Sequence, residues 1–525
     1  MDIIEKEKKK RTILYGLLVT VLVLIGVTYA YYRITKTQTN SNVIGTRTCL
    51  NTTLTEETSE IVLSDAFPIS DEDGLKQSPF TFTLTNNCDS YVKVTIALVS
   101  EYRTSTNTAY LKDNYVKSNL STKGTNDGSS VILSTLSLGE VDTNTQGYVL
   151  KTTGLKNKEA KSFDLRLWLD SETTNEQGLN KTWKGKIVVS VVAAEYVPTF
   201  AETILANNEV KAPITTPGAA ISTASEALLA SAEDNNGTSY YFRGAVTNNY
   251  VEFANKCWRI VRVGGDDSVK LILHNDNTKK VANPCDAANN SASAAFARYS
   301  GETYKSAFNT NYNDNAYVGF KYGTVGAGDY ALTHANTNNS TILTNLETWY
   351  NDNLSTYEKV IADTEWCNDK TNVTDTTYDP LRLSPNGLGY GTNVTYYGAT
   401  QRLVSKSDSA GGTGPSLKCT GELSKINSKV GLITADELAF AGYVYKQINL
   451  TTYLDENATD TYWWSLSPSA FNGSNASVWH VNGSSGRLYN GYVDGAGGLR
   501  PSISLKSATN VTGEGTSSSP FVVKI

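Results

Sequence analysis

The sequence is poor in the residues and motifs on which most enzyme active sites are built. Its 525 residues include one methionine, three histidines and six cysteines, and charged side chains make up only 19% of them. There is no HExxH sequence, no CxxC pair, no GxSxG motif, no phosphate-binding loop and no dinucleotide fingerprint. Zinc proteases, serine hydrolases, nucleotide hydrolases and dinucleotide-dependent oxidoreductases depend on those patterns. We therefore predict that the protein is not an enzyme and that it holds no metal and no cofactor.

The composition that remains is typical of an exported, β-rich protein. Asn, Thr, Ser and Gly are abundant, and tyrosine occurs 31 times. The formal net charge is −6, and an acidic chain argues against nucleic acid as a partner. At about 150 residues per domain, the length predicts roughly three domains.

The first 32 residues have the pattern of a membrane anchor. A basic head at residues 1–12 precedes an uncharged, mostly apolar run at residues 13–32, which is long enough to cross a bilayer as a helix. The positive charges predict that the head stays in the cytoplasm and that the rest of the chain lies outside the cell. The protein is then a single-pass protein of the cell membrane. The alternative is a signal peptide cleaved after Ala30, which leaves a secreted protein.

Residues 40–197 are predicted to form an all-β sandwich. Apolar and polar residues alternate with the period of two that half-buried strands show, over 80–85, 92–98, 163–170 and 187–191. FTFTLTNNCDSYVKVTIAL and FDLRLWLDSETTNEQGLNKTWKGKIVV resemble exported sandwich domains of Gram-positive bacteria in the camelysin and biofilm-fibre group. The resemblance implies a spacer or fibre-forming module. Residues 198–234 are expected to be a linker with a short helix at 226–230.

Residues 235–508 are predicted to form a second domain of α+β type, followed by a C-terminal strand or tail at 509–525. CWRIVRV and VKLIL, separated by the turn GGDD, predict a β-hairpin near its start. The Asn-, Ala- and Gly-rich residues 285–341 are expected to loop over the surface.

Two helices are expected in this second domain. Residues 342–360 place Leu346, Trp349, Tyr350 and Leu354 at helical spacing toward the core. A second helix follows the sequence Thr-Ala-Asp-Glu at 434–437, which is a capping box. The two acidic residues of that box are adjacent and do not face one site, so we assign them to capping rather than to acid–base catalysis.

The six cysteines divide evenly between the two predicted domains. Cys49 and Cys88 lie in the first, where only one pairing is possible. The second contains four, Cys257, Cys285, Cys367 and Cys419. Even numbers in an exported chain predict disulfides. Of the three pairings open to the second domain, we favour Cys257 with Cys285 and Cys367 with Cys419.

The strongest functional signal lies between Tyr462 and Lys506. Its apolar residues frame many Ser, Asn, Gly and Tyr residues, a mixture typical of adaptable recognition surfaces. The same residues are also common in the turns of any β protein. The candidate ligand-binding residues are Ser465, Ser467, Asn472, Asn475, His480, Asn482, Tyr489, Asn490, Tyr492 and Asp494. For His480 the alternative is a packing role, because no oriented partner for a general base can be identified.

Trp463-Trp464, VWHV at 478–481 and GLRPSI at 498–503 resemble the C-terminal end of bacterial C-type-lectin-like domains. That superfamily includes the formylglycine-generating-enzyme branch and the ligand-binding variable proteins diversified by retroelements. The resemblance covers about residues 235–508 and implies that the final strands carry a ligand face. The oxygen-using enzymes of the superfamily rely on a cysteine pair near the C-terminal end of the domain. No cysteine follows Cys419, so that chemistry has no residues to carry it.

Two functions follow from these expectations. The first is an adhesin-like protein of the cell surface, which binds an extracellular protein or glycan with a lectin-like head displayed on a sandwich spacer. The density of Asn and Tyr, whose codons contain adenine, also fits a variable protein diversified at adenines. The second is a structural surface or fibre protein without a specific ligand site.

Overall fold

The computed structural model describes residues 34–37, 51–57, 61–63, 66–126, 128–140 and 145–525. The described chain is mostly β-sheet with few helices. It divides into two compact units, Met1–Val197 and Pro198–Ile525, here called the first and second units. Among the described residues no helix is both long enough and apolar enough to span a bilayer. The predicted head at 1–12 and the predicted span at 13–32, with Ala30, lie outside the described residues.

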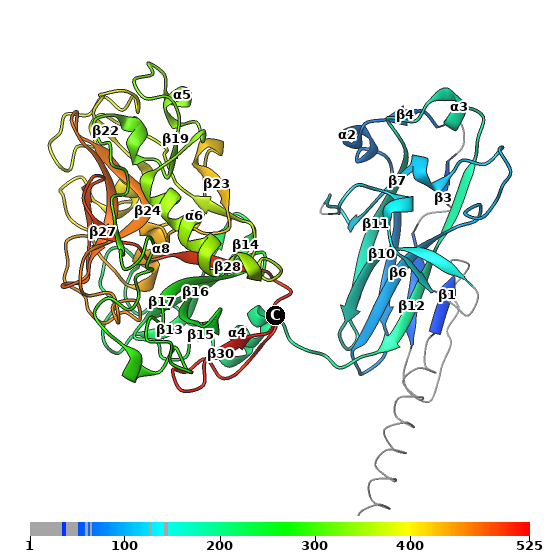
Figure 1. Ribbon diagram of the computed structural model, residues 1–525, viewed down its shortest axis with the longest axis horizontal. Coiled ribbons are helices and arrows are strands. Elements are labelled where there is room, and N and C mark those ends of the chain that lie inside the picture. The colour runs from blue at the N-terminus through cyan, green and yellow to red at the C-terminus, as the bar shows by residue number, and fades with distance from the viewer. Residues whose placement is uncertain (1–33, 38–50, 58–60, 64–65, 127, 141–144) are drawn as a thin grey trace, which may run out of the picture. The chain divides into compact units, whose positions relative to one another are not determined.

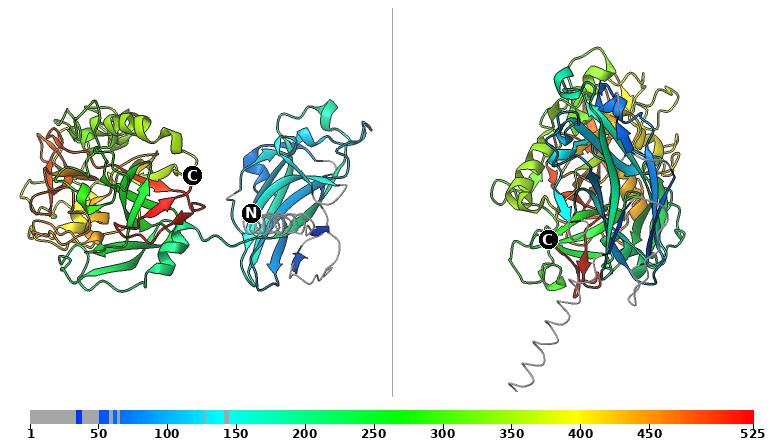
Figure 2. Two further views of the ribbon diagram at one scale, coloured as in Figure 1. Left: turned by 60° about the horizontal axis from the view of Figure 1, so that its bottom comes forward. Right: turned by 90° about the vertical axis from the view of Figure 1, so that its right-hand side faces the viewer.

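The first unit contains two sheets that fit the predicted sandwich (Figure 1 and Figure 2). One has the order β1-β12-β6-β10-β9 with β3 beside β12, and the other has the order β2-β5-β11-β7-β8 with β4 beside β11. The strands are β1 (Ile34–Thr37), β2 (Thr52–Glu56), β3 (Ile61–Leu63), β4 (Pro68–Ile69), β5 (Phe80–Asn86), β6 (Val92–Ser100), β7 (Val116–Thr122), β8 (Val131–Ile132), β9 (Leu138–Glu140), β10 (Gln146–Leu155), β11 (Ala160–Asp170) and β12 (Trp183–Ala193). Two single-turn helices, α2 (Asp71–Gly74) and α3 (Asn175–Gly178), lie in the connections.

The core of the first unit follows from the alternation of its strands. The apolar positions of β5 and β11 come from one sheet, those of β6 and β12 from the other, and they meet in one buried cluster. Members of this cluster are Phe82, Leu84, Val94, Ile96, Leu98, Phe163, Leu165, Ile187, Val189 and Val191. Burying such side chains contributes about 1.5–3 kcal/mol each, which is why period-two patterns mark these strands.

The second unit is built around two larger sheets. The first runs β13-β14-β16-β15-β30-β29, with β17 pairing with both β16 and β28. The second runs β18-β27-β24-β25-β26, with β22 beside β24. The strands of the first are β13 (Ala227–Asp234), β14 (Gly237–Gly244), β15 (Tyr250–Phe253), β16 (Lys256–Val263), β17 (Val269–Asn275), β28 (Ser502–Leu505), β29 (Val511–Thr512) and β30 (Phe521–Val523). Those of the second are β18 (Lys305–Ser306), β22 (Thr395–Tyr396), β24 (Trp463–Phe471), β25 (Ala476–Asn482), β26 (Arg487–Tyr492) and β27 (Gly497–Gly498).

Short elements complete the second unit. Two small ladders pair β19 (Lys321–Tyr322) with β20 (Asn338–Asn339), and β21 (Thr364–Cys367) with β23 (Lys425–Ser428). The helices are α4 (Phe200–Asn207), α5 (Tyr330–His334), α6 (Thr341–Asn353), α7 (Gly398–Leu403) and α8 (Ala435–Ala441). Figure 1 shows β30, in red at the end of the chain, beside the green β15.

Several predicted elements of the second unit are confirmed. β16 and β17 form the expected antiparallel hairpin. The predicted apolar face of α6 is buried, although the helix ends at Asn353 and a 3-10 turn follows at Ser355–Tyr357. α8 begins at the capping box, in which Thr434 accepts from the Glu437 amide and Glu437 accepts from the Thr434 amide.

Three expectations are wrong. Residues 198–234 are not a linker, because α4 packs into the core of the second unit and β13 pairs with β14 along its length. The helix expected at 226–230 is a strand, since pairing with β14 overrides a weak local preference. Residues 285–341 are not simply a surface loop, because widely spaced apolar side chains insert into the core; these are Phe296, Phe308, Val318 and Phe320.

The disulfides of the second unit are those favoured from the sequence. Cys257 is bonded to Cys285 and Cys367 to Cys419. The first ties β16 to the segment after β17, and the second ties β21 to the loop before β23. Cys88 is disulfide-bonded, and its predicted partner Cys49 lies outside the described residues. The two bonds fit an oxidising, extracellular environment.

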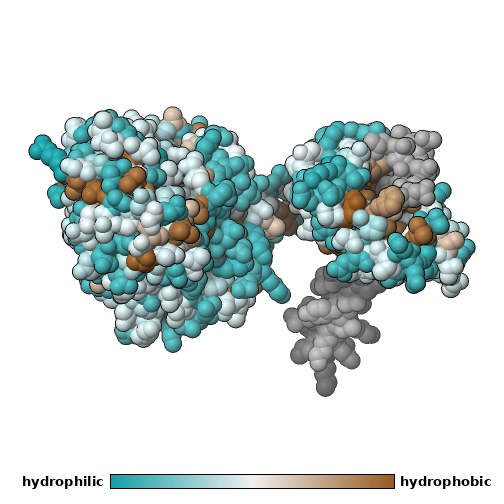
Figure 3. All heavy atoms as spheres, turned by 90° about the horizontal axis from the view of Figure 1, so that it is seen from above, coloured by the Kyte–Doolittle hydropathy of each residue, from teal (hydrophilic) through white to brown (hydrophobic). Residues whose placement is uncertain are grey.

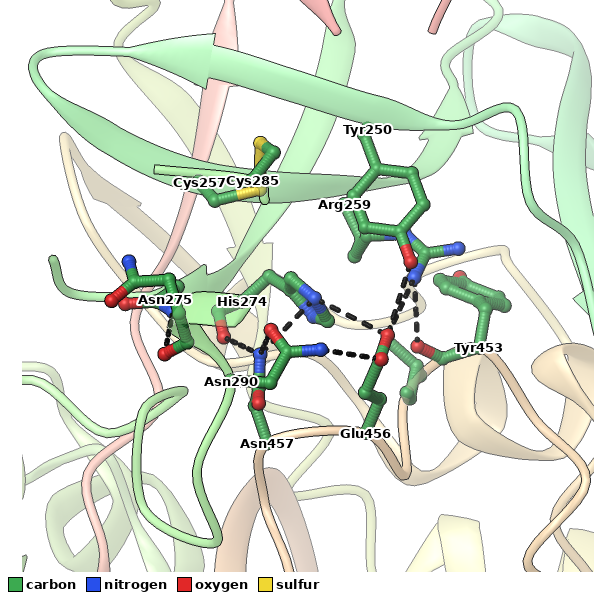
Figure 4. A network of polar contacts seen from close by, with 12 residues as sticks. Tyr250, Cys257, Arg259, His274, Asn275, Cys285, Asn290, Tyr453, Glu456 and Asn457 are labelled. Atoms are coloured by element: carbon green, nitrogen blue, oxygen red, sulfur yellow. Dashed lines mark hydrogen bonds and ion pairs between the residues drawn. A yellow bond between two sulfur atoms is a disulfide. The ribbon is translucent and has the colours of Figure 1, made fainter. Parts of the chain in front are cut away.

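A buried arginine organises the polar network in Figure 4. The guanidinium of Arg259 stacks on the Tyr250 ring at 3.7 Å and donates to Asn249 Oδ1 at 2.7 Å. Glu456 closes the network by accepting from Tyr250 Oη at 3.0 Å. Burial, together with the charges of the nearby arginines, holds the pKa of His274 far below its usual range. Its imidazole is therefore neutral, and its 3.5 Å contact with Glu456 is not a charge pair.

A second buried arginine, Arg500, ties the two larger sheets together. Its Nε donates to the Leu273 carbonyl of β17 at 3.0 Å, and its Nη1 donates to the Leu454 carbonyl at 2.7 Å. The guanidinium lies 4.6 Å from the ring centroid of Trp463, the first residue of β24. Burial lowers the pKa of Arg500 to about 10, which leaves it a cation at neutral pH.

Replacing Arg500 by lysine should lower the free energy of unfolding by about 2–4 kcal/mol. The shorter ammonium cannot reach both carbonyls and the Trp463 face, and each buried carbonyl left without a donor costs about 1–3 kcal/mol. Urea unfolding of the full-length chain measures the change. The exposed Arg487→Lys substitution is the matched control and should change stability by less than about 0.5 kcal/mol. Equal stability of Arg500→Lys and the control would contradict this role.

Candidate functional site

Three strands at one edge of the smaller sheet form the candidate site. β25 lies between β24 and β26 and runs antiparallel to both. The apolar frame expected in this stretch is buried, at Val478, Trp479, Val481, Leu488 and Val493. His480 lies opposite Trp464 on one side and opposite Tyr489 on the other. The register therefore sets His480 and Tyr489 next to each other on one face.

Two of the predicted ligand-binding residues are not at the surface. Ser465 is fully buried, and its hydroxyl donates to the Trp479 carbonyl at 3.0 Å. Ser467 is 1% exposed and accepts from the Ala435 amide at 2.9 Å, at the start of α8. Neither serine belongs to a surface site with His480, because β24 is covered on both faces and its serines satisfy backbone groups there. Ser467 also lines the second cavity described below.

A second group of predicted residues lies away from His480. Asn490 and Tyr492 point to the opposite face of β26 from Tyr489, because side chains alternate along a strand. Tyr492 accepts from Asn472 Nδ2 at 3.3 Å, and Asn472 Oδ1 caps the β24–β25 turn by accepting from the Asn475 amide. Asp494 is exposed just after β26. These residues form a turn-associated surface rather than one site with His480.

The remaining predicted residues line a cavity of about 520 Å³. His480, Asn482 and Tyr489 come from the predicted set, and Lys446 and Arg487 are added by the structure. Arg487 is the only Lys or Arg between Ser465 and Leu499, and this isolated positive charge could have identified it from the sequence. Lys446 had no such signal, because it is far away in the chain and reaches the cavity through a backbone bond from its amide to the Leu488 carbonyl.

Aromatic rings form one wall of this cavity. The Tyr489 ring stacks on the Tyr445 ring with centroids 5.8 Å apart and planes at 7°. Tyr445 also donates to Asp408 at 3.0 Å, and Lys446 forms an ion pair with the same carboxylate at 2.6 Å. Tyr489 is still 39% exposed, so its outer ring face is open for contact. A stacked, anchored tyrosine is a rigid platform with little entropy to lose on binding.

His480 lies at the base of the cavity and is packed by aromatic rings. Its ring centroid is 4.9 Å from that of Tyr462 and 5.9 Å from that of Trp464. A side chain at Gly491 would meet the imidazole at 3.0 Å, so the ring needs glycine opposite it. Burial lowers the pKa of His480 to about 4, which keeps the imidazole neutral at physiological pH. These contacts support the packing role.

Several polar groups of the cavity have no protein partner among the described residues. The guanidinium of Arg487, the side-chain nitrogen of Asn482 and the hydroxyl of Tyr489 make no hydrogen bond or ion pair there, while Asn482 Oδ1 accepts from Ser484 and Ser485. The buried Nδ1 of His480 is likewise unpaired among them. Arg487 is the one charged residue of the lining that lacks a counter-charge in the part of the chain that the structure describes.

A second cavity, of about 450 Å³, is lined by many charged residues, and several of them pair with one another. Glu437 accepts from Arg262 at 2.9 Å and from Lys270 at 2.7 Å. Arg402 pairs with Asp369 and with Asp436, each at 2.7 Å. Burial alone raises the pKa of Glu437, but the two cations lower it to about 2. The charges around Glu437 and Arg402 therefore satisfy each other. Asp266, Asp363 and Lys418 of the same lining form no ion pair among the described residues.

Within the described residues no group of three or more His, Cys, Asp and Glu side chains is arranged to hold a metal ion. Comparisons with known proteins add no relative: no family model, no curated protein and no solved structure matches the chain.

Stability should fall as the pH is lowered from 6.5 to about 4. Burial depresses the folded-state pKa of all three histidines, with His480 at about 4 and His334 at about 3. The unfolded chain, with histidine pKa values near 6.5, then binds more protons than the folded chain in this window, so the stabilisation is complete above pH 6.5 and is lost below it. The expected slope is about 1.4 kcal/mol per pH unit for each such histidine.

Urea unfolding of the full-length chain between pH 7 and 5 measures this slope. In the His480→Gln variant the slope of the unfolding free energy against pH should be smaller by about 1.4 kcal/mol per pH unit, which corresponds to one proton, whatever the absolute stability of the variant. An unfolding free energy that does not change over this window would show that the histidines titrate in the folded state.

Proposed function

We propose that the chain is a ligand-binding protein of the cell surface, in which the second unit is the binding head and the first unit a β-sandwich spacer. The N-terminal pattern of a basic head and a 20-residue apolar run supports attachment to a membrane with both units outside. The disulfides of the second unit support an oxidising environment. A C-type-lectin-like fold for the head is part of the same proposal. It is supported by the C-terminal sequence pattern and by the final strands, which lie at one edge of a sheet with side chains open to solvent.

The observation that carries the proposal is the cavity beside β25 and β26. It combines an exposed, stacked tyrosine with an amide, a hydroxyl and a guanidinium that have no partner among the described residues. A ligand site requires polar side chains that line one cavity and have no hydrogen-bond partner within the protein. The second cavity has no aromatic residue in its lining, and its innermost charges are already paired.

Tyr489→Ala should weaken ligand binding about tenfold or more, because it removes the aromatic wall of the cavity. The matched control is Tyr492→Ala, which removes a tyrosine that is 51% exposed on the same strand but faces away from the cavity. The control should bind like the original chain. Binding of both variants and the original to saccharide and host-protein arrays, using the full-length chain in detergent, gives the comparison.

The competing function is a structural surface or fibre protein with no specific ligand. It would be supported if the original chain bound nothing on either array, and also if both tyrosine variants bound as well as the original. Loss of binding in the Tyr492 variant alone would move the site to the turn-associated surface around Asn472. In each case near-ultraviolet circular dichroism confirms that the variant is folded.

A further inference from the structure

The cavity beside β25 and β26 carries a positive charge that nothing in its lining balances. Of its two cations, Lys446 is paired with Asp408, and Arg487 has no counter-charge among the described residues. None of the five lining residues is acidic, and His480 is neutral. The formal net charge of the chain is −6, so the positive charge of this cavity is opposite in sign to that of the chain as a whole. The cavity should therefore attract a negatively charged group.

The planar shape of the guanidinium also limits which anionic groups the cavity can bind well. A guanidinium is planar and offers two parallel donors, which match the two oxygens of a carboxylate or of a sulfate ester. Arg487 is the first residue of β26 and lies opposite Asn482 on β25, so its backbone position is set by the ladder. Asn482 and Arg487 line the same cavity, so the side-chain amide of Asn482 can provide a further donor for a neighbouring oxygen of the ligand.

The rest of the cavity fits a sugar ring. The open face of Tyr489 can pack against the CH groups of a ring, while its hydroxyl and the Asn482 amide can bond ring hydroxyls. A volume of about 520 Å³ lies within the range of about 300–1,000 Å³ found for small-molecule sites. A protein partner would need a broad interface of roughly 800 Å² on each side, with an apolar centre. On the one face of the second unit that Figure 3 shows, the residues are hydrophilic to neutral and the hydrophobic ones form small separate groups, so that face offers no such apolar centre.

From these features we infer that the ligand of this cavity is an acidic saccharide, whose carboxylate or sulfate group binds Arg487 and whose ring packs on Tyr489. This inference rests on the proposed function, because it names the ligand of the same site. A protein ligand is the competing outcome of the test.

The test begins with the full-length chain on an array of saccharides that contains neutral, uronic-acid, sialic-acid and sulfated members. Binding should be confined to the acidic members. The strongest carboxylate-bearing ligand is then compared with its carboxyl-reduced derivative, which keeps the rings and loses the charge. We expect the reduced form to bind at least tenfold more weakly in isothermal titration calorimetry. Sulfated members of the array distinguish recognition of a carboxylate from recognition of any anionic group.

Variants locate the effect at Arg487. The Arg487→Gln variant keeps a polar side chain but removes the charge, and it should bind the acidic saccharide at least tenfold more weakly, while binding the carboxyl-reduced form as the original chain does. The affinity of the original chain should also fall with added salt, and that of Arg487→Gln should fall less. Arg487 is exposed, so its replacement should leave the fold intact, and the urea midpoint of the variant checks this.

The outcomes separate the inference from the proposed function. If neutral saccharides bind as well as acidic ones, or if Arg487→Gln binds like the original, the inference is wrong while the binding function stands. If only a protein binds and Tyr489→Ala abolishes that binding, the saccharide assignment is wrong and the site remains. If nothing binds on either array, both the proposed function and the inference fail.

Discussion

The position of the candidate site depends on a cation held in the core of the second unit. The guanidinium of Arg500 joins a carbonyl of β17, a carbonyl near Leu454 and the ring of Trp463. Trp463 begins β24, which pairs with β25, and β25 pairs with β26. Arg500 is therefore connected to the strands that line the cavity through Trp463 and the ladder of β24, β25 and β26. Backbone carbonyls and an aromatic face help to hold this buried cation, because they supply oriented dipoles and a ring quadrupole, and the charge of Asp455 adds a favourable interaction.

The two cavities are similar in size but differ in how their charged residues are paired, and this difference indicates which of them binds a ligand. In the one around Glu437, the cations and carboxylates of several loops are bonded to each other, so the charges hold the loops in place. In the one around Arg487, a single cation is left over and the neighbouring polar groups are free. Unpaired polar groups gain most from an incoming ligand, since no internal bond has to be broken first. That difference, rather than volume, selects the site.

Local pattern predicted the elements whose stability comes from their own sequence. The period of two in β5, β6, β11 and β12, the hairpin of β16 and β17, and the capping box before α8 all agree with the structure. The failures were at β13 and at residues 285–341. There the local sequence is weakly patterned, and pairing with β14 or insertion into a distant core decides the conformation.

The candidate site divides in the same way. Composition alone indicated the stretch between Tyr462 and Lys506, and three of its ten candidate residues, His480, Asn482 and Tyr489, do line the cavity. Composition does not distinguish a serine that bonds a buried carbonyl, as Ser465 does, from one that faces solvent. Composition also does not reveal which face of β26 a residue is on. The sequence-based prediction therefore placed Tyr489 and Tyr492 in one site, although they lie on opposite faces of the strand.

The sequence by itself determined the basic and apolar pattern at the N-terminus, the β-rich character and the stretch that carries the candidate site. Those properties follow from composition and short-range periodicity. The disulfide pairs of the second unit were one of three possibilities until the fold brought the cysteines together. Only the tertiary structure decided that Lys446 and Tyr445 lie beside β26, that Ser465 and Ser467 are buried, and that Arg487 is left without a partner among the described residues. Such contacts join residues far apart in the chain, and their register and burial are set by the packing of whole sheets.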